Sequence, residues 1–263
     1  MYRTGMAAVL LFLYMVIRKK VFELIFRQIG PLFFTGFIIG AHWFFFFEAA
    51  RVSTVSVCLA GMATTTFWTS LVEPLFKKRR VQPLEVILGL IVIGGLYLIF
   101  RFEFNHALGL TLAIISALLA AIFSVLNSQF TLKYRPFEIT LYEMIGATVG
   151  IILFIPIYKW QLMDTESIYA IPTSRDWGLL GILSVVCTVY AFSVSVELMK
   201  RISAFVVNLT VNLEPVYGII MALVLYGEKE QMSNGFYYGT LVILLAVLAY
   251  PIYSNIKRKR VKV

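Results

Sequence analysis

Nine apolar runs constrain the fold of this chain more than any other feature of its sequence. Most are about 20 residues long, and short charged loops separate them. A transmembrane α-helix needs about 20 apolar residues, whereas a transmembrane strand alternates apolar and polar residues over about 10. The sequence therefore predicts an all-α polytopic membrane protein. The predicted helices cover about 4–17, 31–50, 54–76, 84–100, 107–131, 137–158, 178–198, 203–226 and 236–255.

The composition agrees with this class. The chain is 60 % hydrophobic and 14 % charged, and its mean hydropathy is +0.86. A soluble domain has roughly 45–50 % apolar and about 25 % charged residues, so the excess apolar surface is expected to face lipid. The net charge of +9 does not indicate nucleic-acid binding, because the basic residues occur in short runs between spans. Cys58 and Cys187 fall within spans and are expected to pack as small apolar groups, so no metal site is predicted.

Basic residues are distributed unequally between the two sides of the predicted membrane topology. One side has 17 of the 23: Arg18, Lys19, Lys20, Arg27, Lys77, Lys78, Arg79, Arg80, Lys133, Arg135, Lys200, Arg201, Lys257, Arg258, Lys259, Arg260 and Lys262. Cytoplasmic loops are enriched in Lys and Arg. This distribution predicts a multi-pass protein of the plasma membrane (a bacterial inner membrane) with a cytoplasmic C-terminus. The connection 159–177 is expected to be an ordered external loop.

A block of sequence recurs after 150 residues. Residues 50–53 match 200–203, and residues 89–93 match 239–243 without a gap. With the predicted topology, Arg51 lies outside and Arg201 lies in the cytoplasm, so the two copies run in opposite directions through the membrane. Inverted repeats are typical of secondary transporters, which expose a midplane site to each side in turn.

The two copies are unequal in length. The first repeat is predicted over 1–104 with four helices, and the second over 105–263 with five helices and a basic cytoplasmic tail. The helix at 107–131 has no counterpart in the first copy. We therefore expect a 5+5 architecture whose first helix is missing here, with Met1 an internal methionine of a longer reading frame or the start of a truncated chain.

The second copy carries motifs of a known family. Residues 212–217 read Asn-Leu-Glu-Pro-Val-Tyr and residues 225–228 read Leu-Tyr-Gly-Glu. They resemble the "L-x-P … L-x-G-E" stretch in the ninth helix of the EamA family, within the drug/metabolite transporter superfamily. Gly239 and the apolar run after it resemble the tenth helix of that family. The resemblance implies ten helices, a central cavity between two bundles, and export of small metabolites, amino acids or drugs from the cytoplasm.

Polar side chains within the spans are the candidate substrate-cavity residues, because an ionisable group at membrane depth costs about 2.5–3.5 kcal/mol on insertion scales and usually faces a cavity or a partner. Glu214 precedes Pro215, a helix break that frees a backbone carbonyl. Glu214 could bind a substrate amine, carry a proton or stabilise helix packing. The complete candidate set is His42, Trp43, Thr65, Trp68, Ser124, Asn127, Tyr190, Asn208, Asn212 and Glu214.

Several of these residues allow two interpretations. His42 could titrate and couple transport to protons, or it could be a neutral hydrogen-bonded histidine among aromatic rings. Trp68 could form an apolar cavity wall or pack in the core. Asn208 and Asn212, one turn apart, could bind substrate or join helices. Other carboxylates are expected to be structural, with Glu143 beside a close-packing Gly-x-x-x-Gly and with Glu48, Glu73 and Glu197 near helix ends, available to Arg51, Lys77 and Arg201.

The resulting functional prediction is a secondary transporter that works by alternating access, with proton coupling as one option. Its partners would be a small-molecule solute, the lipid bilayer and protons. The alternatives are an intramembrane enzyme and a non-transporting scaffold. An enzyme would need a catalytic group of residues, but the chain has only two histidines and its aspartates lie in the external loop. No nucleotide-binding motif occurs, and no cofactor is predicted.

Overall fold

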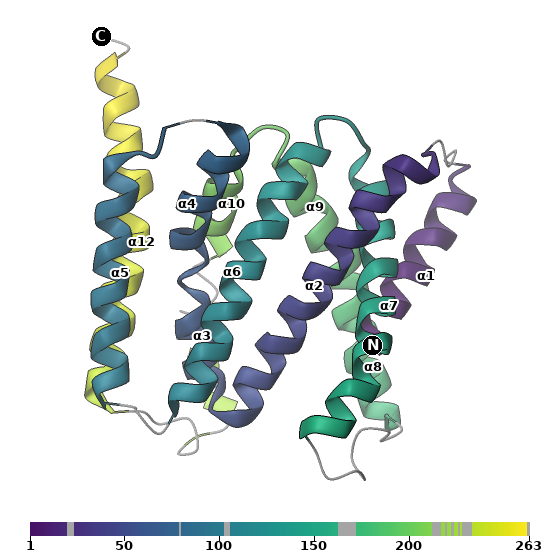
Figure 1. Cartoon of the computed structure of the whole chain (residues 1–263), viewed down its shortest axis with the longest axis horizontal. Coiled ribbons are helices and arrows are strands. Elements are labelled where there is room, and N and C mark those ends of the chain that lie inside the picture. The colour runs from purple at the N-terminus through teal and green to yellow at the C-terminus, as the bar shows by residue number, and fades with distance from the viewer. Residues whose placement is uncertain are drawn as a thin grey trace. The chain divides into compact units, whose positions relative to one another are not determined.

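The structure is a computed structural model of the chain, and it describes all residues except 20–23, 79, 103–105, 163–171, 212–216, 219, 222–223, 226, 228–232 and 262–263. Every regular element among the described residues is helical (Figure 1). The elements are α1 (Tyr2–Ile17), α2 (Phe26–Val52), α3 (Val55–Met62), α4 (Thr65–Lys77), α5 (Pro83–Phe102), α6 (Ala107–Phe130), α7 (Pro136–Leu162), α8 (Ser174–Ile182), the π-helix η2 (Leu183–Tyr190), α9 (Ala191–Leu198), α10 (Ala204–Val211) and α12 (Asn234–Val261). The predicted all-α fold class is confirmed.

The chain divides into two compact units. Unit 1 comprises Met1–Ala41 and Leu126–Arg201, and unit 2 comprises His42–Val125 and Ile202–Val263. Helices α2 and α6 each contribute one part to unit 1 and the other part to unit 2. Both units thus combine segments of the two predicted repeats.

In unit 1, α1 packs on α7 and η2. The rings of Tyr14 and Phe137 lie 5.1 Å apart, which places the end of α1 beside the start of α7. At the other end of α1, Arg3 Nε donates a hydrogen bond of 2.8 Å to Thr188 Oγ1 on η2. Thr188 Oγ1 in turn donates to the carbonyl oxygen of Leu183, five residues earlier. The hydroxyl therefore links the widened turn of η2 to α1.

Helices α2 and α7 approach each other closely through glycines within unit 1. A Cβ atom on Gly36 would lie 2.3 Å from the backbone oxygen of Glu143, and one on Gly146 would lie 2.1 Å from that of Phe33. Neither distance accommodates a methyl group, so the two backbones touch where side chains would otherwise separate them. The close packing predicted around Gly146 is confirmed.

In unit 2, α5 and α12 lie side by side and run in opposite directions (Figure 1). A Cβ atom on Gly95 would lie 2.9 Å from the backbone oxygen of Gly239. A core of buried side chains connects α12 with the rest of the unit, and it includes Val57, Leu110, Phe205, Phe236 and Ile243.

Two predicted helices and one predicted loop differ from the observed elements. The predicted helix 54–76 is interrupted between α3 and α4 at residues 63–64, and 178–198 is built from α8, η2 and α9. The predicted loop 159–177 is shorter than expected, because α7 continues to Leu162 and α8 begins at Ser174. A capping box fixes that beginning: Thr173 Oγ1 accepts from the backbone nitrogen of Asp176, whose carboxylate accepts from the backbone nitrogen of Thr173.

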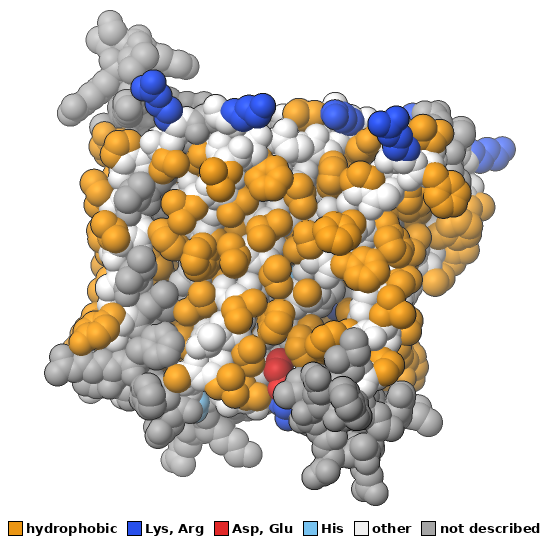
Figure 2. Space-filling model, in the orientation of Figure 1, with side chains coloured by type: hydrophobic (Ala, Val, Ile, Leu, Met, Phe, Trp, Pro, Cys, Tyr) orange, Lys and Arg blue, Asp and Glu red, His pale blue; other side chains and the backbone are white. Residues whose placement is uncertain are grey.

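Five described helical segments are long and apolar enough to cross a membrane: Phe26–Val52, Val55–Lys77, Ala107–Phe130, Pro136–Pro156 and Ser174–Leu198. Tyr2–Ile17 and Asn234–Ala246 are shorter apolar helices. Figure 2 shows hydrophobic side chains over the visible face of the helices, while the Lys and Arg side chains in view gather at helix ends. An apolar surface on this scale requires a lipid environment, and the chain is a multi-pass membrane protein.

Candidate functional site among the membrane helices

The buried side chain of Asn208 joins three helices of unit 2. Its Nδ2 donates to Thr69 Oγ1 on α4 at 2.8 Å, and its Oδ1 accepts from Ser124 Oγ on α6 at 3.1 Å. Thr69 Oγ1 donates to the carbonyl oxygen of Thr65 at 2.7 Å. Because the Thr69 proton is used in that bond, its oxygen is left to accept, which fixes the nitrogen end of the Asn208 amide toward α4. We call these four residues, all buried, the Asn208 network.

The Asn208 network lies beside the interruption between α3 and α4. There, Thr64 Oγ1 donates to the carbonyl oxygen of Gly61 at 2.8 Å, and Thr65 Oγ1 donates to that of Met62 at 2.7 Å. Threonine hydroxyls that bind preceding carbonyls compete with the backbone ladder. Ala63 and Thr64 keep right-handed helical φ and ψ angles, so the interruption is a tight turn within one continuous helical segment. Transporters use interrupted helices at their binding sites.

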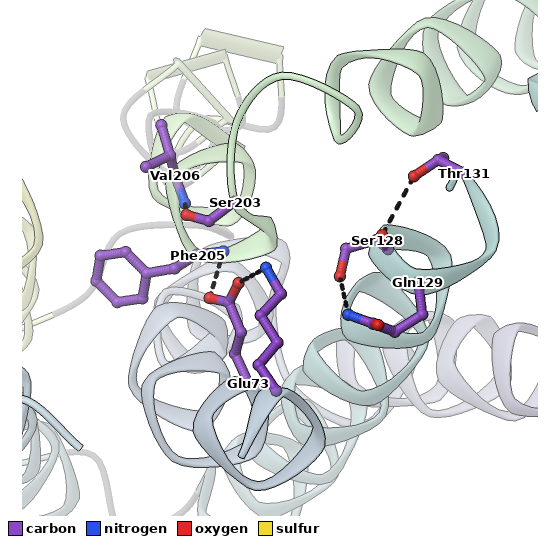
Figure 3. A network of polar contacts seen from close by, with 8 residues as sticks. Glu73, Ser128, Gln129, Thr131, Ser203, Phe205 and Val206 are labelled. Carbon is purple, nitrogen blue, oxygen red and sulfur yellow. Dashed lines mark hydrogen bonds and ion pairs between the residues drawn. The ribbon is translucent and has the colours of Figure 1, made fainter. Parts of the chain in front are cut away.

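A second buried polar contact in unit 2 fixes the start of α10. One carboxylate oxygen of Glu73 accepts from the backbone nitrogen of Phe205 at 3.3 Å, and the other accepts from Lys77 Nζ at 2.6 Å (Figure 3). The backbone nitrogens in the first turn of a helix have no partner within it, and a carboxylate there also complements the helix dipole. Ser203 Oγ accepts from the nitrogen of Val206 in the same turn. The buried charge of Glu73 is thus matched by a cation and an amide.

Two of the carboxylate pairings predicted from the sequence are confirmed. Glu73 pairs with Lys77, and Glu48 accepts a 2.8 Å hydrogen bond from Arg51 Nε. Glu197 is exposed on α9. Figure 3 also draws the end of α6, where Gln129 Nε2 donates to Ser128 Oγ and Thr131 Oγ1 donates to the carbonyl oxygen of Ser128.

His42 is buried and joins α2 to α6 within unit 2. Its Nδ1 lies 2.8 Å from Ser116 Oγ and 3.0 Å from the Ser116 carbonyl oxygen. The Ser116 hydroxyl donates to the carbonyl oxygen of His42 at 2.8 Å, so the proton in the ring contact comes from Nδ1. The ring lies 5.4 Å from that of Phe123 and 6.3 Å from that of Phe46. This geometry is that of a hydrogen-bonded histidine among aromatic rings, one of the two interpretations above.

The remaining described candidates occupy different environments. Trp68 follows Thr65 by three residues on α4, and its buried Nε1 has no hydrogen-bond partner among the described residues. Trp43 is half-buried on α2. Tyr190, at the end of η2 in unit 1, is 67 % exposed. Three candidates, Thr65, Ser124 and Asn208, thus come together in one network.

The family motif lies largely outside the described residues. This holds for Asn212, Glu214 and Pro215, which belong to the stretch 212–216. Gly227 is described and has a φ of +57°. Residues that have a side chain rarely adopt this left-handed backbone conformation, so glycine is favoured at that position of the "L-x-G-E" motif.

Asn127 belongs to unit 1, where it contacts Glu143. Asn127 Nδ2 donates to Glu143 Oε2 at 3.4 Å, and both side chains are buried. From the sequence, Asn127 is expected in the cavity and Glu143 in a structural contact, and the two residues are not expected to pair. Each lies within a helix of its own, and the sequence carries no signal that relates the two positions.

These features define a class: an all-helical, multi-pass membrane protein with polar side chains joined in its interior beside an interrupted helix. Residues 107–250 match the EamA-like transporter family. The chain therefore belongs to the EamA-like transporter family, within the drug/metabolite transporter superfamily.

Comparison with other proteins gives the fold further support. A protein of known crystal structure aligns at a TM-score of 0.65 with 15 % sequence identity, over 94 % of this chain and 84 % of its own. At this identity the likeness concerns the fold alone. No curated protein sequence matches the chain.

Proposed function

We propose that this protein is a secondary transporter that exports small metabolites, amino acids or drugs from the cytoplasm by alternating access, coupled to protons. Membership of a transporter family supports the general class. The observation that carries the proposal for this chain is the Asn208 network beside the interrupted helix. It combines hydroxyl and amide groups with neighbouring apolar side chains, which suits an amphipathic solute.

The proposed solute site consists of the Asn208 network with the indole of Trp68. Trp68 Nε1 is a buried donor without a partner among the described residues, and such a donor is costly unless something binds to it. A solute carrying a carboxylate or carbonyl oxygen would supply that acceptor. Asn212 and Glu214 follow Asn208 along the chain and belong to the proposed site through the family motif.

The proposed orientation in the membrane follows from the charges at the helix ends. In unit 1, the contact between Tyr14 and Phe137 places the C-terminal end of α1 beside the start of α7. Arg18 and Lys19 end α1, and Lys133 and Arg135 precede α7. This basic end is the cytoplasmic one by the positive-inside rule. The C-terminus is proposed to lie on the same, cytoplasmic side. The membrane is proposed to be a bacterial inner membrane.

We also propose that residues 1–104 and 105–263 are inverted copies. Helices α5 and α12 contain the matched stretches 89–93 and 239–243. In unit 2 these helices run antiparallel, as corresponding helices of inverted copies would (Figure 1). Two similar bundles of opposite direction provide the two conformations that alternating access requires.

The proposal is tested by comparing metabolites in the medium of cells that express the wild-type chain, Asn208→Leu or Thr210→Ala. Leucine keeps the approximate volume of asparagine but forms neither hydrogen bond of the network. Thr210 is an exposed residue of the same helix and serves as the matched control. We expect a class of small solutes to accumulate in the medium with the wild type and with Thr210→Ala, but not with Asn208→Leu. Identical media for all three, at equal protein levels in the membrane, would overturn the proposal.

A further inference from the structure

Glu143 differs from Glu73, the buried carboxylate that binds the start of α10. Its side chain is fully buried on α7, about 10 Å from the start of the helix at Pro136 (1.5 Å per residue). Glu73 receives a cation and a backbone amide, whereas Glu143 receives only the 3.4 Å contact from Asn127 Nδ2. Its second oxygen, Oε1, has no hydrogen-bond partner among the described residues.

Glu143 Oε1 and Asn127 Oδ1 could bind each other if Glu143 carried a proton. The Asn127 Oδ1 atom is also buried and without a partner in the described part of the chain. An ionised carboxylate only accepts hydrogen bonds, whereas a carboxylic acid also donates one. When Glu143 is protonated, its O–H can donate to Asn127 Oδ1 while Asn127 Nδ2 donates back. The acid and the amide then form a pair of reciprocal hydrogen bonds, and each satisfies the other.

We infer that Glu143, paired with Asn127, is a proton-binding site of this protein, and that binding and release of the proton alter the contact between α6 and α7. As the site of the coupling proton, it rests on the proposed function. Its role as a proton-binding site does not.

The charged side chains on the helices packed against α7 either bind other residues or are exposed. On α1, Arg3 donates to Thr188, and Arg18 ends that helix in an exposed position. Arg27 on α2 and Glu197 on α9 are exposed. On α7 itself, Glu138 accepts from the backbone nitrogen of Arg135 and caps the helix. Among the described residues, Asn127 is the hydrogen-bond partner of the Glu143 side chain.

Residue 143 lies where α7 packs closely against α2. Its backbone oxygen is the atom nearest to a Cβ on Gly36, at 2.3 Å, and its side chain contacts Asn127 on α6. On α6, Asn127 follows Ser124 of the Asn208 network by three residues. Residues three apart on a helix lie about 4.5 Å apart along its axis. A change at the Glu143–Asn127 pair therefore acts on the helix that also carries part of the proposed solute site.

Infrared difference spectroscopy between acidic and neutral pH tests the inference on the whole protein in liposomes. The carbonyl stretch of a protonated carboxyl group is resolved from that of a carboxylate. We expect the wild type to gain a buried-acid band on acidification, and Glu143→Gln to lose that band. Glu73→Gln, the matched control, should keep it. Asn127→Leu should shift both the frequency of the band and the pH at which it appears, because the acid then lacks its amide partner.

The outcomes separate this inference from the proposed function. If the spectra of the wild type and Glu143→Gln show the same band changes, Glu143 does not exchange a proton and the inference is wrong, whatever the protein transports. If the band is present but the wild type moves no solute, the proton site stands and the transporter proposal fails. When transport is found, Glu143→Gln should abolish its dependence on a pH gradient. Unchanged dependence would remove Glu143 as the site of the coupling proton.

Discussion

The side-chain amide of Asn208 on α10 donates a 2.8 Å hydrogen bond to Thr69 on α4, and both residues are buried. Hydrogen bonds between membrane helices contribute about 0.6 kcal/mol on average and up to about 1.7 kcal/mol. We therefore expect Asn208→Leu to lower the free energy of unfolding by about 1 kcal/mol and to leave the protein folded. Unfolding in detergent with increasing denaturant measures the change. A loss too large for the protein to be purified would show that Asn208 is chiefly structural.

The glycine contact between α2 and α7 predicts a large effect from one methyl group. Gly36→Ala places a Cβ against the backbone of Glu143 and Ala147, which cannot move as a side chain can. We expect it to destabilise the protein by about 1–3 kcal/mol, as overpacking does in other cores. Gly30→Ala on the same helix is the control, since a Cβ there meets nothing within 4 Å. Equal unfolding midpoints for the two variants would contradict the contact.

Removal of the Glu73 carboxylate should destabilise the start of α10. Glu73→Ala leaves the backbone nitrogen of Phe205 buried without its acceptor, which costs about 1–3 kcal/mol. Glu48→Ala removes the matched surface pair with Arg51, whose side chain is half exposed, and we expect a loss of about 0–1 kcal/mol. Thermal unfolding in detergent compares the two variants. The account of Glu73 as a helix cap fails if both lose the same stability.

The predicted orientation can be measured at single positions. Lys133→Cys introduces an exposed thiol before α7, and Arg175→Cys introduces one in the first turn of α8. Both are made in a chain whose free cysteines Cys58 and Cys187 are replaced. A thiol reagent that cannot cross the membrane should label position 175 in intact cells, and position 133 only after the cells are broken. The reverse pattern would contradict the proposed topology.

Much of the fold could be predicted because hydropathy reports helix length directly. All nine apolar runs contain helix in the described residues. The interruption at residues 63–64 could not be predicted, because threonines 64–66 lie in a run that stays apolar enough to cross a membrane. The π-helix η2 contains Thr188, which accepts a hydrogen bond from Arg3, 185 residues away. Neither hydropathy nor periodicity reports such a tertiary contact.

The buried polar groups could be predicted by residue type but not by their pairings. Polar residues within apolar spans identified Ser124, Asn127 and Asn208 as candidate cavity residues, because such residues are costly in lipid, and all three are buried. Which of them meet depends on how the helices rotate against one another. The sequence therefore did not indicate that Asn208 bonds to both Ser124 and Thr69, or that Asn127 meets Glu143.

The central claim is that the protein moves a solute across a membrane, and transport by the purified protein in liposomes tests it most directly. The solute is the one that differs in the medium of expressing cells, supplied in labelled form. With a pH gradient imposed across the liposome membrane, the account predicts that wild-type protein accumulates the solute above its external concentration. Asn208→Leu should stay at the level of empty liposomes, and Thr210→Ala should match the wild type. No accumulation by the wild type, at a protein density at which infrared spectra show folded helices, would contradict the account.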